Sequence, residues 1–186
     1  MIDIEAFISE HGELLKMSWA KNFWYRSSIM KMVLDKEELY RALKDGILTN
    51  WAVAHNGKRL FKCSNGEEAI KANQAGSTLL VRETNLLWPT LTDIGTQLGK
   101  YLGVPYSDTS IVLSSKEVSG FSLHMDPYDL LIVQISGDKE WELYDLEYAR
   151  VDPVILRAGD VFHLPRHHRH AAVPLTDCCH LAFKFK

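Results

Sequence analysis

The second half of the sequence is a series of short apolar runs separated by turn residues. The runs fall at residues 111–113, 130–135, 141–144, 154–156, 161–164 and 181–185. Between them lie Ser136-Gly137-Asp138 and Ala158-Gly159-Asp160, which suit tight reversals of the chain. Many short strands at this spacing are typical of an antiparallel sandwich or barrel. Residues 50–54, 59–62 and 78–81 could supply further strands.

The first part of the chain favours helices. Capping or stop residues frame four segments, at 4–11 (Asp3 and Gly12), 36–44 (Asp35 and Gly46), 66–75, and 89–102 (Pro89 and Gly103). We therefore expect an α+β fold, in which N-terminal and flanking helices surround a jelly-roll barrel, that is, a double-stranded β-helix. The length suits one domain over residues 1–186, mostly helical over 1–75 and with the jelly-roll core over 76–186.

Composition narrows the classes of partner. The formal net charge of −3 gives no general attraction to nucleic acid or to an anionic membrane, so neither is expected as a partner. No apolar run is long enough to cross a bilayer. Cys63, Cys178 and Cys179 form neither a disulfide framework nor a zinc motif, and the N-terminus does not resemble a signal peptide. These features predict a cytoplasmic protein with reduced thiols.

A candidate metal site comes from three residues in the second half. In a strand His124 and Asp126 would project to one face, and antiparallel folding could return His170 beside them. Two imidazoles and one carboxylate on one face form the facial triad favoured by Fe(II). HxD pairs also occur by chance. Spacing alone therefore leaves open that His124 and His170 are ordinary hydrogen-bonded histidines.

Lys139 favours the metal reading. It follows the turn at Gly137, and alternation places it on one face with Trp141 and Leu143. A lysine among apolar side chains is costly to bury unless it meets an anion. Inside a metal-containing barrel that anion could be the far carboxylate of an oxo-acid. The alternative is a lysine whose ammonium group reaches solvent at the barrel mouth.

A family resemblance rests on two segments, GFSLHMDPYDLLIVQISGDKEWELY and GDVFHLPRHHRH. They resemble the JmjC-type Fe(II)/2-oxoglutarate-dependent oxygenases, and are most similar to the cupin-like ribosomal-protein oxygenase branch. Gln134, Gly137 and Lys139 fit the family's strand, turn and basic residue, and the GDV…P turn precedes its distal histidine. Leu87-Trp88-Pro89 resembles its helix start, and His180-Leu181 its last strand. The resemblance covers roughly residue 78 to the end.

The resemblance implies roles for individual residues. His124, Asp126 and His170 would bind iron, and Lys139 would pair with the distal carboxylate of 2-oxoglutarate. A hydroxyl from the preceding strand could join it, with Ser110 and Ser115 preferred and Ser114 also considered. Residues expected to line a substrate pocket are Tyr128, Leu130, Ile132 and His168. His163 is not expected to be a ligand.

The expected function is hydroxylation of an amino-acid side chain, in a peptide, a protein or a free amino acid. Its cofactors would be Fe(II), 2-oxoglutarate and O2. The ribosomal branch has further C-terminal regions that this sequence lacks, so the resemblance does not imply a ribosomal substrate. The alternative is a metal-binding cupin without 2-oxoglutarate chemistry, either another enzyme or a non-catalytic binding protein. Aromatic residues around Trp19, Phe23, Trp24 and Tyr25, expected on N-terminal helices, could pack on the barrel or form a homodimer face.

Overall fold

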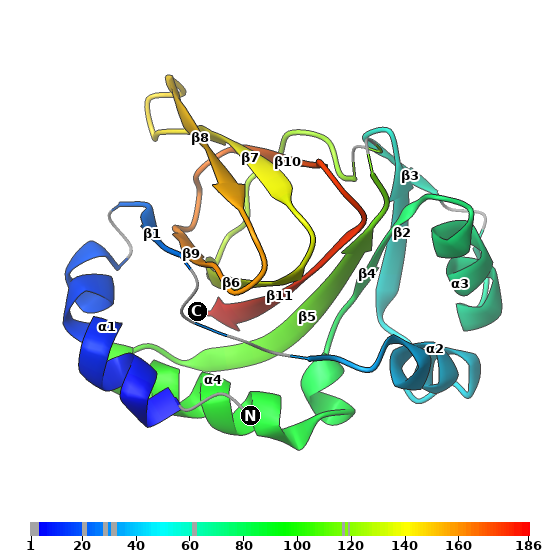
Figure 1. Ribbon diagram of the computed structural model, residues 1–186, viewed down its shortest axis with the longest axis horizontal. Helices are drawn as coiled ribbons and strands as arrows, with labels where there is room; N and C mark the ends of the chain where they lie inside the picture. The colour runs from blue at the N-terminus through cyan, green and yellow to red at the C-terminus, as the bar shows by residue number, and fades with distance from the viewer. Residues whose placement is uncertain are drawn as a thin grey trace.

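Two antiparallel sheets form the centre of the molecule (Figure 1). The computed structural model describes residues 4–19, 22–27, 30, 33–60, 63–116, 118 and 120–186. Within these, the large sheet has the strand order β1-β9-β6-β11-β5-β4-β2-β3 and the small sheet the order β10-β7-β8. Their bounds are β1 Trp24–Arg26, β2 Trp51–His55, β3 Lys58–Leu60, β4 Thr78–Val81, β5 Tyr106–Ser114, β6 Asp129–Ser136, β7 Lys139–Tyr144, β8 Arg150–Leu156, β9 Val161–Leu164, β10 His170–Pro174 and β11 Cys178–Phe185.

Helices cover the outer face of the large sheet (Figure 1). They are α1 Ile4–Ser18, α2 Lys36–Lys44, α3 Gly66–Gln74 and α4 Pro89–Leu102, with a short 3-10 turn, η1, at Thr84–Leu86. Alternate residues of β11 point to opposite sides. Leu181 and Phe183 pack against the helices, whereas Ala182 packs between the two sheets against Ile132 and Trp141. The central strands β6 and β11 are therefore buried on both faces, which explains why they are almost continuously apolar.

This architecture is the jelly-roll fold expected from the sequence. Helices α2 and α4 and strands β4 and β9 lie where their patterns predict. The Asp35 carboxylate caps α2, because it accepts hydrogen bonds from the backbone N–H of Glu37 and Glu38 at 2.9 and 3.1 Å. Strands β2 and β3 also form, shifted by one residue from prediction. Residues 61–62 of the predicted 59–62 strand, and the predicted cap Asp3, lie outside the described residues.

Two local predictions are wrong. Helix α1 does not end before Gly12 but continues to Ser18. Gly12 is not a helix stop but allows close packing, since a Cβ there would lie 2.8 Å from the ring of Tyr101 on α4. The aromatic segment is not wholly helical either, since Trp24–Arg26 is a strand, β1, that pairs with β9. Trp19 and Trp24 are nevertheless buried in the core between helices and sheet.

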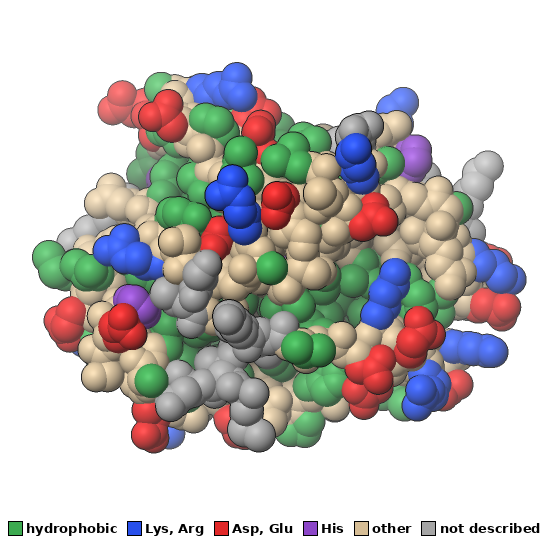
Figure 2. Space-filling model, viewed as in Figure 1, with side chains coloured by type: hydrophobic (Ala, Val, Ile, Leu, Met, Phe, Trp, Pro, Cys, Tyr) green, Lys and Arg blue, Asp and Glu red, His purple; other side chains and the backbone are tan. Residues whose placement is uncertain are grey.

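The division between residues 75 and 76 remains a prediction, and β1 to β3, which precede it, belong to the large sheet. Among the described helices, none combines the length and hydropathy needed to span a membrane. Figure 2 shows acidic and basic side chains interspersed over the visible face.

Candidate active site

His124, Asp126 and His170 come together where an irregular segment meets the small sheet. His124 and Asp126 lie before β6 and not on a strand as predicted. Two reciprocal backbone hydrogen bonds nevertheless join this segment to β10: the N–H of His124 donates to the His170 carbonyl at 3.1 Å, and the N–H of His170 donates to the His124 carbonyl at 2.8 Å. The same segment bridges the β2–β3 turn through Gly57 and Phe121. It therefore closes the barrel between the two sheets.

The three side chains have the geometry of a metal centre. One potential ligand atom from each lies within 4.8 Å of the others. The His124 and His170 ring centroids are 4.3 Å apart, and His170 Nε2 lies 3.7 Å from Asp126 Oδ2. Within the described part of the chain, no other group of three His, Cys, Asp or Glu residues has this geometry.

Backbone carbonyls orient both imidazoles. Nδ1 of His124 lies 2.8 Å from the Ser122 carbonyl, and Nδ1 of His170 lies 3.1 Å from the His168 carbonyl. A carbonyl can only accept, so each Nδ1 carries the proton and each Nε2 keeps its lone pair for a metal. Burial, and then the nearby charge of His124, lower the pKa of His170 to about 4. The ring is therefore neutral at pH 7, as a metal ligand must be.

The triad opens into a cavity of about 330 Å³ between the sheets. Most of the predicted site residues line it, namely His124, Asp126, His170, Lys139, Ser110, Tyr128, Leu130 and Ile132. Burial, and then the nearby Asp126 carboxylate, raise the pKa of the Tyr128 phenol. The structure therefore brings most of the predicted site residues to one cavity, and their roles as ligands and pocket residues stay predictions.

Lys139 is buried at this cavity without an anionic partner among the described residues. Its Nζ donates to Ser114 Oγ at 2.9 Å and lies 3.4 Å from His180 Nδ1. Burial lowers the pKa of Lys139, and also lowers the pKa of His180 well below its usual range. Ser114, the third of the serines considered, is thus the one that contacts the lysine. His180 was missed, although alternation along β11 places it on the inner face with Ala182 and Lys184.

Several polar atoms at the cavity wall have no hydrogen-bond partner among the described residues. Thr78 Oγ1, Ser110 Oγ and Trp141 Nε1 are buried, lack a hydrogen bond and belong to residues that line the cavity. Buried polar groups in proteins are nearly always satisfied by protein, water or ligand. The unpaired donors, together with Lys139, are therefore suited to a polar ligand that carries negative charge.

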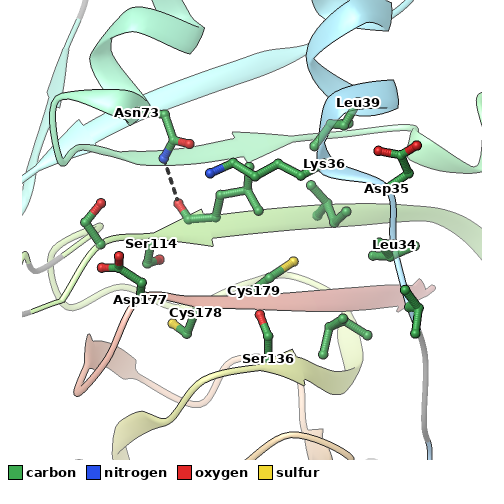
Figure 3. A pocket seen from close by; sticks show the side chains of 15 residues that line it. Leu34, Asp35, Lys36, Leu39, Asn73, Ser114, Ser136, Asp177, Cys178 and Cys179 are labelled. Atoms are coloured by element: carbon green, nitrogen blue, oxygen red, sulfur yellow. Dashed lines mark hydrogen bonds between the residues drawn. The ribbon is translucent and has the colours of Figure 1, made fainter.

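Two predicted site residues lie elsewhere. His168 packs edge-on against Phe23 at a separate surface pocket, and its Nδ1 lies 3.1 Å from the Arg166 carbonyl. Ser115 borders a second cavity of about 430 Å³ on the helix side of the large sheet, which Figure 3 shows with Lys36, Asn73 and the adjacent Cys178 and Cys179. As expected, His163 is not part of the triad, because it stacks on Trp19 and faces Asp129.

Comparisons with known proteins agree with this geometry. Residues 96–186 match the family model of the JmjC domain. A search of curated protein sequences found no match. Among solved structures, the fold resembles the Escherichia coli ribosomal oxygenase YcfD with cobalt and 2-oxoglutarate, at a TM-score of 0.70 and 17% identity, covering 95% of this chain and 51% of that one.

Other structures of YcfD give the same result. The complex with cobalt and succinic acid matches with a TM-score of 0.70 and 16% identity, again over 95% of this chain and 51% of that one. Another structure of YcfD has a TM-score of 0.72 at 18% identity, over 94% and 51%. The chain thus spans about half the length of these proteins. Residues 96–186, which include all three residues of the triad and Lys139, match the JmjC domain model, and the jelly-roll fold resembles that of a ribosomal oxygenase.

Proposed function

We propose that the protein is an Fe(II)- and 2-oxoglutarate-dependent oxygenase that hydroxylates an amino-acid side chain in a peptide, a protein or a free amino acid. The observation that carries the proposal is the presence of the His124–Asp126–His170 cluster and buried Lys139 in one cavity. The JmjC match and the cobalt and 2-oxoglutarate bound by YcfD support the proposal.

The donor set fits Fe(II). Two neutral imidazoles and one carboxylate are a donor set that Fe(II) oxygenases use, so His124, Asp126 and His170 would hold the ion. Bound iron with 2-oxoglutarate and O2 supplies the chemistry that inserts one oxygen atom into a C–H bond, while the co-substrate becomes succinate and CO2. The protein contributes the fixed ligand geometry, because backbone contacts set the position and tautomer of both imidazoles.

In this proposal Lys139 would hold the distal carboxylate of 2-oxoglutarate, at the end of the cavity away from the triad. In the small sheet His170 pairs with Leu143, and Pro174 pairs with Lys139. Pro174, the residue opposite Lys139, therefore lies four positions along β10 from His170. This corresponds to a distance of roughly 13 Å at about 3.3 Å per residue. The Lys139 side chain shortens this gap. A dicarboxylate could then reach the metal with one end and Lys139 with the other, satisfying the charge that the protein leaves unpaired.

The apolar wall around this path would protect the reaction from water. Leu130, Ile132 and Trp141 line the cavity and pack with Phe162 between the sheets. A site closed to bulk water strengthens the ion pair to Lys139 and limits side reactions of the oxidant. No residue has to act as a general base, because the hydroxylation would be an oxidation of the C–H bond and not the removal of a proton from it.

A metal-binding cupin without 2-oxoglutarate chemistry is the alternative. Such a protein would retain the three ligands, but it would have no use for a lysine buried without an anion. The environment of Lys139 therefore favours the oxygenase, and the same residue separates the two functions experimentally.

The function is tested by incubating the protein aerobically with iron, 2-oxoglutarate and a panel of amino acids, peptides and proteins. We expect succinate to form in proportion to a product heavier by one oxygen atom, and Asp126→Ala to abolish both. Metal-loaded protein that consumes no 2-oxoglutarate, with or without candidate substrates, would support the alternative. Cytoplasmic location and homodimer formation remain predictions.

A further inference from the structure

Two more basic residues line the cavity besides Lys139, and they differ in their pairing. Lys184 Nζ binds Asp108 Oδ1 at 2.8 Å and lies 5.4 Å from the Tyr128 ring centroid. Arg82 contacts only the Asn50 side-chain oxygen, at 3.4 Å, and forms no ion pair with any residue in the described part of the chain. Its guanidinium charge is therefore available to a ligand.

The backbone holds Arg82 firmly at the cavity wall. Its N–H donates to the Asn50 carbonyl at 2.8 Å, which extends the β2–β4 ladder by one residue. Alternation places Arg82 on the same face as Thr78 and Leu80, both of which line the cavity. Glu83 follows with a left-handed φ of 60°, a conformation that a non-glycine residue keeps only when its surroundings enforce it.

Arg82 and Lys139 stand at different levels of the cavity. Lys139 contacts Ser114, whereas Arg82 lies beside Ser110, because the preceding residue Val81 pairs with Ile111. Ser110 and Ser114 are four residues apart on β5, roughly 13 Å at about 3.3 Å per residue. Arg82 also lines the same cavity as Asp126 and Tyr128. Arg82 thus belongs to the triad end of the cavity.

We propose that Arg82 binds a carboxylate of the primary substrate. This inference rests on the proposed function, because it assumes that 2-oxoglutarate occupies the Lys139 end. Arg82 forms no ion pair among the described residues, so its charge near the reacting centre suits an anion on the substrate. A guanidinium pairs with a carboxylate through two parallel hydrogen bonds, which fixes orientation as well as position. The carboxylate comes from a free amino acid, a peptide C-terminus or an acidic side chain beside the target.

The test compares matched acids and amides under anaerobic conditions, so that nothing turns over. Iron-loaded protein with 2-oxoglutarate is titrated with each common N-acetyl amino acid and its primary amide. Capped dipeptides that contain Asp or Asn form a second set. Calorimetry reports affinity, and the visible band of the 2-oxoglutarate–iron chelate reports the co-substrate. The first set detects terminal carboxylates and the second detects acidic side chains.

We expect at least one acid to bind tenfold or more tightly than its amide. Arg82→Gln should remove that preference and leave the chelate band intact, whereas Arg150→Gln, a control on exposed β8, should change neither. The absence of any acid preference in the wild type, or its persistence in Arg82→Gln, overturns the inference while the band still supports the proposed function. Loss of the band in Arg82→Gln would also overturn it, by assigning Arg82 to 2-oxoglutarate. No band in the iron-loaded wild type would refute the proposed function itself.

Discussion

At the scale of single residues, the environment of Lys139 is the feature that distinguishes a cavity for an anionic co-substrate from a purely structural cavity. The protein buries its ammonium against a serine hydroxyl and a neutral imidazole, both weaker partners than a carboxylate. Desolvation of an unpaired cation costs stability. An anionic co-substrate that pairs with the ammonium group on binding would offset this loss of stability.

Lys139→Met should therefore change stability and binding in opposite directions. Methionine is unbranched, only one heavy atom shorter than lysine, and uncharged, so the free energy of unfolding of the ligand-free protein should stay equal or increase. Affinity for 2-oxoglutarate should fall at least tenfold, because losing one partner of a buried charge pair costs about 2 kcal/mol or more. Urea unfolding and calorimetry measure the two effects.

Lys71→Met is the matched control, since Lys71 is exposed on α3 and forms only an i,i+4 pair with Glu67. It should alter stability by less than about 0.5 kcal/mol and leave 2-oxoglutarate binding unchanged. If Lys139→Met destabilised the ligand-free protein by several kcal/mol and bound 2-oxoglutarate normally, Lys139 would be a structural residue.

Residue-level prediction from sequence succeeded where alternation or a motif applied. The triad and Lys139 were identified because the HxD, the basic residue and the distal histidine occur in a recognisable order. His180 and Arg82 were missed, because their roles depend on which strands become neighbours. The preference for Ser110 and Ser115 over Ser114 rested on no local signal, since the serine that contacts Lys139 depends on how β5 lies relative to β7.

At the scale of elements, the β6–β7 turn positions Lys139. Gly137 lies in this turn with φ of +64°, and a Cβ there would meet the Asp177 carbonyl at 2.2 Å. The turn can therefore hold only glycine without moving β7 relative to the segment before β11. The lysine follows two residues later, so any shift of the turn reaches the candidate co-substrate site.

Gly137→Ala should destabilise the protein and weaken 2-oxoglutarate binding together. Gly103→Ala is the control, because Gly103 has φ of +74° but nothing within 4 Å of its virtual Cβ. Both variants adopt a strained left-handed alanine, which costs about 1 kcal/mol, but only Gly137→Ala adds a backbone clash. Equal losses of stability in the two variants, with unchanged 2-oxoglutarate affinity in both, would show that the turn does not determine the position of Lys139.

Elements with local signals were predicted well, and elements defined by distant partners were not. Helices α2 and α4 have recognisable ends, namely a capping Asp35 and a Pro89–Gly103 frame. Gly12 was wrongly predicted to end the first helix, because its role is a close contact with Tyr101, which is distant in the sequence. Strand β1 has only three residues and exists through its pairing with β9. The HxD segment was expected as a strand, and its position instead depends on isolated bridges.

At the scale of the whole molecule, the large sheet carries a core on each face. The outer core packs against helices, and the inner core lies between the sheets around the cavity. Buried histidines belong to both regions: His163 stacks on Trp19, whereas His170 and His180 line the cavity. Burial is the main cause that lowers the pKa of each of the three.

Acid should therefore destabilise the metal-free protein. Each histidine has a folded pKa below the ordinary 6.5, so its stabilising contribution is complete above pH 6.5 and is lost as the pH falls through the folded value. Each group that charges only on unfolding contributes a slope of up to about 1.4 kcal/mol per pH unit. Urea unfolding at a series of pH values between about 7.5 and 5 measures the total.

His163→Phe tests the origin of this slope, since phenylalanine can still stack on Trp19 but cannot take up a proton. The variant should show a shallower loss of stability between pH 6.5 and 5 than the wild type. Stability that stayed constant or increased on acidification would contradict the description of these histidines as neutral buried groups.

The most direct test of the central claim is anaerobic titration of iron-loaded protein with 2-oxoglutarate, followed by the visible charge-transfer band of the chelate. The account predicts a saturable band in the wild type, a band that needs far more 2-oxoglutarate in Lys139→Met, and no band in Asp126→Ala. Wild-type protein that contains stoichiometric iron and shows no band would contradict it, and would make the cavity that of a metal-binding cupin without 2-oxoglutarate chemistry.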